Sequence, residues 1–156
     1  MQDTETKEKR KLSFDIVLGL MAPPTYYDIS TAENLQRTIL EWINAHCKRT
    51  YEPLPYKIIS ARFNRYAKKF NLNLVDVLQK FANEKQLYIW TMTTGGRVAF
   101  SMELVEMLLN NAEESFQDVP DHMFAYEVEK KFLEDIERTA VRVARPKAYD
   151  KKYLKE

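Results

Sequence analysis

The sequence predicts a mainly α-helical protein with one small antiparallel β-hairpin. Apolar residues recur at helical spacing in five segments, which is typical of helices that bury one face. One run of β-branched and aromatic residues is followed by two glycines and a shorter apolar run, which is typical of a hairpin. Apolar residues make up 45% of the 156 residues, enough for a core and too many for a disordered chain.

The first two predicted helices are separated by the prolines Pro53 and Pro55. The first helix is predicted to begin at Ser30, because Ser30 and Glu33 have the spacing of a capping box. Its apolar face consists of Leu35, Ile39, Trp42 and Ile43. The second helix begins at Lys57 or Ser60 and ends near Phe70. Its apolar positions are Ile59, Phe63, Tyr66, Ala67 and Phe70, and Arg62, Arg65, Lys68 and Lys69 occupy others.

A third helix is predicted after a short turn at Asn71 and Leu72. Asn73 can cap this helix, since an asparagine side chain accepts a hydrogen bond from the free N–H groups of a first turn. Its inward positions are Leu74, Val77, Leu78 and Phe81, and its outward positions are Asp76, Gln79, Lys80 and Asn83. The hairpin follows as strands 87–92 and 97–100, joined by a turn in which Gly95 and Gly96 can take positive φ.

Two further helices complete the chain. Ser101 is predicted to cap the fourth, and Pro120 and Asp121 begin the fifth, which Pro146 ends. Apolar positions of these helices are Leu104, Val105, Leu108, Leu109 and Ala112, then Phe124, Val128, Phe132, Ile136 and Val143. The predicted organisation is an N-terminal tail with a strand or docking segment (1–29), a core domain (30–101), a helical extension (102–145) and a basic tail (146–156).

The order of two helices, a short turn, a third helix and a hairpin resembles that of the winged helix-turn-helix superfamily. The similarity covers residues 54–100, and the first helix extends it to nearly half of the chain. No particular family within the superfamily is indicated. The resemblance implies that the third helix enters a DNA major groove and that the hairpin contacts the flanking backbone or minor groove. The expected function is therefore binding of double-stranded DNA, sequence-specific or architectural, in transcription or replication control.

The resemblance also implies roles for individual residues. The positions of a recognition helix are Asn73, Asp76, Gln79, Lys80 and Asn83. Amides such as Gln79 and Asn83 can pair bidentately with adenine, whereas Asp76 is expected to favour the helix dipole without touching DNA. Phosphate contacts are expected from Arg62, Arg65, Lys68 and Lys69, and from Arg97 beside the tip of the hairpin.

Charge is distributed unevenly although the net charge is only +1. Residues 48–97 contain ten basic and three acidic residues, a net charge of +7. Residues 98–140 contain three basic and eleven acidic residues, a net charge of −8. A basic middle segment next to an acidic one bears on the choice of partner, and it favours a polyanion for the middle segment.

Other classes of function are not indicated. One cysteine, Cys47, and two histidines, His46 and His122, cannot supply a tetrahedral zinc site without carboxylates, so we expect no metal and no cofactor. No nucleophile–base arrangement or phosphate loop is present, so we do not expect an enzyme. The acidic residues Glu103, Glu106, Glu113 and Glu114 are expected to form a solvated helix face. The charged N-terminus and the lack of a long apolar stretch favour a cytoplasmic, nucleoid-associated protein, or a nuclear one in a eukaryote, without membrane contact.

The main alternative is a winged-helix adaptor that binds another protein, since fold alone does not decide function. The acidic segment and the apolar faces of the last two helices favour a protein partner. These faces should pack on the first helix or on a second copy, and a homodimer through them would present two recognition helices. The aromatic residues Tyr88 and Trp90 could stack on bases, but packing of the hairpin against helices is the preferred interpretation.

Overall fold

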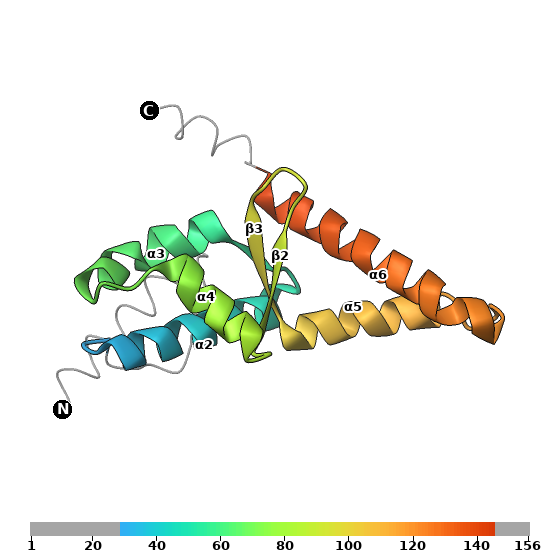
Figure 1. Ribbon diagram of the computed structural model, residues 1–156, viewed down its shortest axis with the longest axis horizontal. Coiled ribbons are helices and arrows are strands. Elements are labelled where there is room, and N and C mark those ends of the chain that lie inside the picture. Colours follow the sequence, from blue (N-terminus) through green and yellow to red (C-terminus); the bar gives the residue numbers. More distant parts are fainter. Residues whose placement is uncertain (1–28, 146–156) are drawn as a thin grey trace.

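The computed structural model describes residues 29–145 and shows a mainly helical protein with a three-stranded antiparallel sheet (Figure 1). The predicted fold class is confirmed at this level. The predicted N-terminal tail with its strand or docking segment, up to residue 28, and the basic tail at 146–156 lie outside the described residues. Over residues 29–145, none of the helices combines the length and the apolar character that crossing a bilayer requires.

Helix α2 (Ala32–Thr50) starts later than predicted, and its N-cap is Thr31 instead of Ser30. The Thr31 side chain accepts a hydrogen bond from the backbone N–H of Asn34 at 3.1 Å. Both hydroxyl residues are suitable caps, and the one used is the last residue with extended backbone before the helix, here Thr31 at φ −119° and ψ 153°. The buried face consists of Leu35, Ile39, Trp42, Ile43 and Cys47, as the spacing predicts for the first four.

Strand β1 (Leu54–Pro55) was not predicted, because the two prolines indicate only a break. It pairs antiparallel with β3, with Leu54 opposite Ala99 and Pro55 opposite Val98. The strand order is β1-β3-β2, so β1 is an edge strand. A proline is tolerated at an edge because its missing N–H removes no ladder bond from a second neighbour. This short strand leads directly into α3 (Tyr56–Lys69).

The turn between α3 and α4 (Leu74–Asn83) is held by local backbone bonds. Asn71 has a left-handed backbone (φ 56°), and the N–H of Leu72 donates to the carbonyl of Ala67 at 2.8 Å, which ends α3 in the usual way. Asn73 then caps α4, as predicted, by accepting from the N–H groups of Val75 at 2.9 Å and Asp76 at 3.3 Å. The short segment between the two helices therefore sets the position of α4 relative to α3.

The β-hairpin is formed by β2 (Leu87–Thr91) and β3 (Arg97–Ser101). Gly95 takes a positive φ of 100° in the turn, as predicted. Side chains alternate between the two sheet faces. One face carries Tyr88, Trp90, Val98 and Phe100, and the other carries Leu87, Ile89, Ala99 and Ser101. Strand β3 lies against α2 and β2 lies against α4, and Tyr88 on the first face contacts Phe132 of the last helix.

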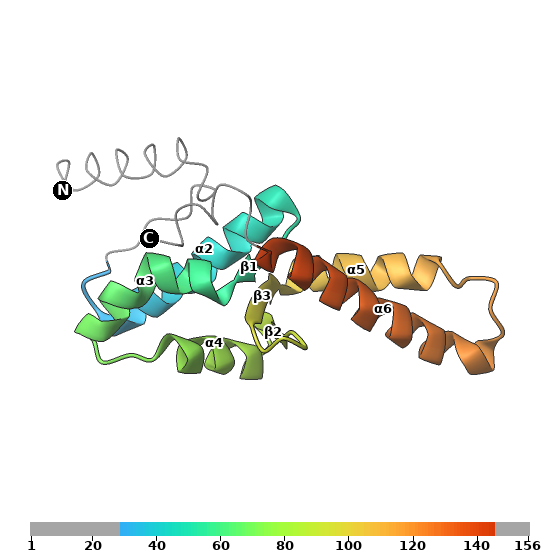
Figure 2. The same ribbon diagram turned by 90° about the horizontal axis from the view of Figure 1, so that it is seen from above.

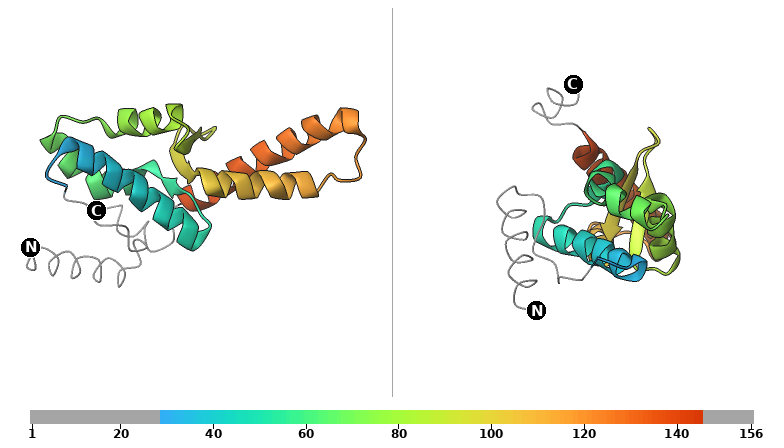
Figure 3. Two further views of the ribbon diagram at one scale, coloured as in Figure 1. Left: turned by 90° about the horizontal axis from the view of Figure 1, so that it is seen from below. Right: turned by 90° about the vertical axis from the view of Figure 1, so that its left-hand side faces the viewer.

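Helices α5 (Met102–Glu114) and α6 (Asp121–Ala144) form a helical hairpin. Ser101 caps α5, as predicted, by accepting from the N–H of Leu104 at 3.1 Å. The inner parts of the two helices pack on the rest of the protein, α5 against α2 and β3 and α6 against β1 and β2. Figures 2 and 3 show their outer parts extending away from α2, α3 and α4.

Asn73→Ala should lower the free energy of unfolding by about 0.5–2 kcal/mol, because two N–H groups of α4 lose their acceptor. Urea denaturation followed by circular dichroism measures the change. Asn64→Ala is the matched control, since Asn64 is exposed in the middle of α3 and alanine is the better helix former. Equal stability of Asn73→Ala and wild type would show that the cap contributes nothing.

Candidate nucleic-acid interface

The outward face of α4 is polar, as the sequence predicts. Asp76, Gln79, Lys80 and Asn83 are exposed, and Leu74, Val77, Leu78 and Phe81 are buried. The amide nitrogen of Gln79 donates to the amide oxygen of Asn83 at 2.9 Å, which keeps the two amides together on the outer face. Asn73 uses its side-chain oxygen for the helix cap, so only its amino group is left for another partner.

The predicted cations of α3 are not equivalent. Arg65, Lys68 and Lys69 are exposed, whereas Arg62 is half-buried. Within the described part of the chain, none of the three exposed cations forms an ion pair. Lys68 and Lys69 occupy the last turn of α3, immediately before the turn that leads into α4. They therefore lie where the chain enters the candidate recognition helix.

The two remaining predicted cations occupy separate places. Lys80 lines an open groove together with Gln36 and Arg37 of α2. Arg97 is the first residue of β3, beside the tip of the β-hairpin. Figures 1 and 2 place this tip well away from the α3–α4 turn. The predicted cations thus form a group on α3, with Lys80 and Arg97 set apart from it.

The β-hairpin and α4 nevertheless lie on the same side of the molecule. Figures 2 and 3 show both elements on the side opposite α2. Because α4 buries its apolar face inward, its polar face is turned to solvent on that side. A long partner could therefore contact α4 and the β-hairpin together.

Glu137 of α6 holds the β-hairpin in place, and sequence reasoning did not identify it. Its carboxylate accepts hydrogen bonds from the indole N–H of Trp90 and, at 3.2 Å each, from the backbone N–H and the hydroxyl of Thr93. The bond from Trp90 is the main reason that the pKa of Glu137 is lowered. The helical hairpin thereby fixes the turn of the β-hairpin, and the contact joins residues 44 and 47 positions apart.

Tyr88 and Trp90 are half-buried and pack against the core, as the preferred interpretation predicts. Their rings stack with centroids 6.3 Å apart and an angle of 13° between planes. Tyr88 also meets the edge or face of Phe100 at 6.0 Å and of Phe132 at 6.4 Å. Burial raises the pKa of the Tyr88 phenol. The pair thus contacts β3 through Phe100 and α6 through Phe132 and Glu137.

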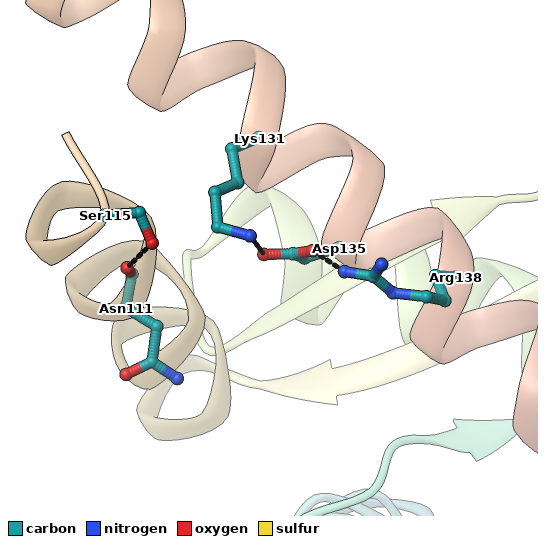
Figure 4. A network of polar contacts seen from close by, with 5 residues as sticks. All are labelled: Asn111, Ser115, Lys131, Asp135 and Arg138. Carbon is teal, nitrogen blue, oxygen red and sulfur yellow. Dashed lines mark hydrogen bonds and ion pairs between the residues drawn. The ribbon is translucent and has the colours of Figure 1, made fainter.

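A buried carboxylate, Asp135, lies near Glu137 on α6. Its partners are Lys131, with Nζ at 3.4 Å, and Arg138, one turn away on either side (Figure 4). On α5, the hydroxyl of Ser115 donates to the carbonyl oxygen of Asn111 at 2.9 Å. Pairing with two cations on its own helix offsets the cost of burying the Asp135 charge. We assign this group a structural role in α6.

His46 and Cys47 lie on the inner part of α2. Burial, reinforced by the charge of Arg49, lowers the pKa of His46 from 6.5 to about 4. Burial raises the pKa of the Cys47 thiol despite hydrogen bonds with Ser101. Among the residues that the structure describes, no group of three or more His, Cys, Asp or Glu side chains is arranged to hold a metal ion. Glu103, Glu106, Glu113 and Glu114 are exposed on α5.

Comparisons of this chain with protein-family models, with curated proteins and with solved structures gave no match. Function must therefore be inferred from the chain's own residues.

Glu137→Ala should loosen the turn of the β-hairpin, because Trp90 and Thr93 lose their shared acceptor. We expect faster amide hydrogen exchange at Thr93 and a shifted indole N–H resonance for Trp90, both measured by NMR. Glu134→Ala, an exposed glutamate one turn earlier on α6, is the control and should change neither. Unchanged exchange at Thr93 in Glu137→Ala would contradict the proposed contact.

Stability should fall between pH 6.5 and pH 4 partly because of His46. In that window the unfolded chain binds a proton at His46 and the folded protein does not, so lowering the pH favours unfolding. His46→Gln should reduce this slope in urea denaturation carried out at a series of pH values. His122→Gln, at an exposed position, should retain it. Parallel stability profiles for wild type and His46→Gln would show that burial of the imidazole is unimportant.

Proposed function

We propose that this chain is a winged-helix protein that binds double-stranded DNA. In this proposal α4 is the recognition helix, the β2–β3 hairpin is the wing, and the α3 cations contact phosphates. The observation that carries the proposal is the placement of α4 and the β-hairpin on one side of the molecule (Figure 2). A three-helix unit followed by a hairpin in this arrangement is what major-groove docking by the third helix requires.

The side chains of α4 suit base-edge recognition. Gln79 and Asn83 stand next to each other on the exposed face, and both are amides that can pair with adenine in the major groove. Their mutual hydrogen bond orders them before DNA arrives, which lowers the entropic cost of binding. Asp76 lies in the first turn of α4, where its charge favours the helix dipole.

Electrostatics support the same orientation. The segment that contains α3, α4 and most of the β-hairpin has a net charge of +7, and the following segment has a net charge of −8. Because the outer part of the helical hairpin extends away from α3 and α4, the acidic residues of that part are kept at a distance from a duplex bound there (Figure 1). The uneven charge would orient the protein during its approach to DNA.

The alternative is an adaptor that binds protein through the helical hairpin. The specific observation in its favour is that Met123 and Tyr126 near the start of α6 are 43% and 66% exposed. Exposed Tyr and Met are enriched at protein interfaces. The two functions are compatible if the hairpin recruits a partner to DNA, in transcription or replication control.

Binding to random duplex DNA should weaken steeply with salt. The logarithm of the binding constant should fall against the logarithm of the salt concentration with a slope of roughly 0.9 for each phosphate contact. The double variant Arg65→Glu with Lys69→Glu should lower affinity for all sequences and reduce that slope. Fluorescence anisotropy with a labelled duplex measures both. Gln79→Ala should instead weaken binding to a preferred sequence while leaving random-duplex affinity nearly unchanged.

The matched control compares Arg65→Glu with Lys130→Glu, which changes the net charge equally but lies on α6. If both single variants weaken binding to the same degree, only net charge matters and the α3 face is not the site. If the wild type shows no salt-dependent affinity at ~50 mM salt, DNA binding is refuted and the adaptor alternative is favoured.

A further inference from the structure

The outer end of the helical hairpin is acidic and carries exposed apolar side chains. We define the tip as residues 109–129, the end of α5, the connection and the start of α6. The tip contains six acidic residues and no lysine or arginine. Met123 and Tyr126 are among the large apolar side chains that the described part of the chain leaves exposed. An apolar group within an acidic surface indicates a contact site for a basic partner that also offers an apolar side chain.

The tip has little packing of its own. Ala112 of α5 and Val128 of α6 are buried, but they lie outside the main core cluster of the protein. Figures 2 and 3 show the tip at the far end of the molecule from α3. The tip therefore cannot reach the basic α3 surface of its own chain without rearrangement. Within residues 29–145, α2, α3 and α4 all lie away from the tip (Figure 2).

A matching surface exists on α3. Its outward residues fall on one side of the helix because their spacings are 1, 3, 4 and 3. They are Lys57, Ile58, Ala61, Arg65 and Lys68, and all are exposed. Ile58 is 39% exposed and lies among these cations. The α3 surface thus combines positive charge with an exposed apolar residue, and the tip combines negative charge with exposed apolar residues.

We propose that the tip of one copy docks on the outward face of α3 of a second copy, in a head-to-tail arrangement. A two-fold contact between two tips would bring two acidic surfaces together, which is unfavourable. A head-to-tail contact joins different surfaces, so each complex keeps one free tip and one free α3 face. The assembly therefore extends into short rows with increasing concentration, instead of stopping at a dimer.

The same α3 cations serve the proposed DNA binding, which gives the contact a regulatory consequence. An acidic tip on α3 occupies the place of phosphates, so self-association and duplex binding compete for Arg65 and Lys68. The head-to-tail contact itself does not depend on DNA binding. The two proposals can therefore fail separately, and they need separate measurements.

The decisive experiment mixes two defective variants of the full chain. The tip variant, Met123→Ser with Tyr126→Ser, retains a normal α3 face. The face variant, Arg65→Glu with Lys68→Glu, retains a normal tip. Sedimentation velocity should show wild type growing in mass with concentration, each variant alone as a monomer, and the equimolar mixture as a heterodimer that grows no further. The heterodimer is expected because one functional tip and one functional face remain in the mixture.

A salt series and a charge-matched control variant distinguish the head-to-tail contact from nonspecific association. Raising salt from ~50 mM to ~500 mM should dissociate wild-type rows, because the Debye length shrinks from about 14 Å to about 4 Å. Lys80→Glu with Lys85→Glu changes the net charge as the face variant does, but it lies on and after α4 and should leave self-association intact. Circular dichroism of every variant checks that the fold is retained.

Three outcomes would overturn the proposal. Self-association of the face variant alone would indicate a contact between tips. A mixture of the two variants that stays monomeric would show that tip and face do not meet. A wild type that is monomeric at about 1 mM would exclude even a weak contact. Random duplex DNA added to wild-type rows tests the competition. If the rows persist and no DNA binds, the DNA proposal fails while the head-to-tail contact stands.

Discussion

The arrangement of this protein depends on the burial of β3 between two groups of helices. Val98, Ala99 and Phe100 are all at most 1% exposed, although side chains in a strand alternate between faces. Strand β3 lies against α2, α3 and α5, and Val98 and Phe100 belong to the face that carries Tyr88 and Trp90. As the central strand, β3 holds together β2, which lies against α4, and the strands β1 and β2, which lie against α6.

The second determining contact is the carboxylate of Glu137. It connects α6 to the turn of the β-hairpin through Trp90 and Thr93, so the candidate wing is supported by the same helix whose far end forms the tip. A partner that displaces α6 at the tip would therefore also act on the β-hairpin. The inner end of the helical hairpin packs on the sheet, and its outer end extends into solvent (Figure 2). If both proposals hold, α6 connects the surface proposed to bind protein with the β-hairpin proposed to contact DNA.

Elements with strong local signals were predictable. The buried positions of α4, its Asn73 cap, the Ser101 cap of α5 and the position of the β-hairpin agree with the structure because spacing and side-chain chemistry determine them within a few residues. The predictions failed where two local solutions are nearly equivalent. Ser30 and Thr31 are both competent caps, and the choice depends on the backbone path into α2. Strand β1 was missed because two residues, one of them Pro55, are too few to show a periodicity, and only pairing with β3 makes them a strand.

The sequence alone determined which residues are candidates for partner contact. They are the amides and cations of 62–83, the acidic residues of 98–140, and the apolar faces of the last helices. These follow from composition and helical period, which are local properties. Tertiary structure decided which of these residues act together. It separated Arg97 and Lys80 from the α3 cations, placed Tyr88 and Trp90 in packing contacts, and brought Glu137 to a turn more than 40 residues away in the chain. Contacts of that separation leave no period in a sequence, because they depend on how whole elements pack and not on the residues next to each side chain.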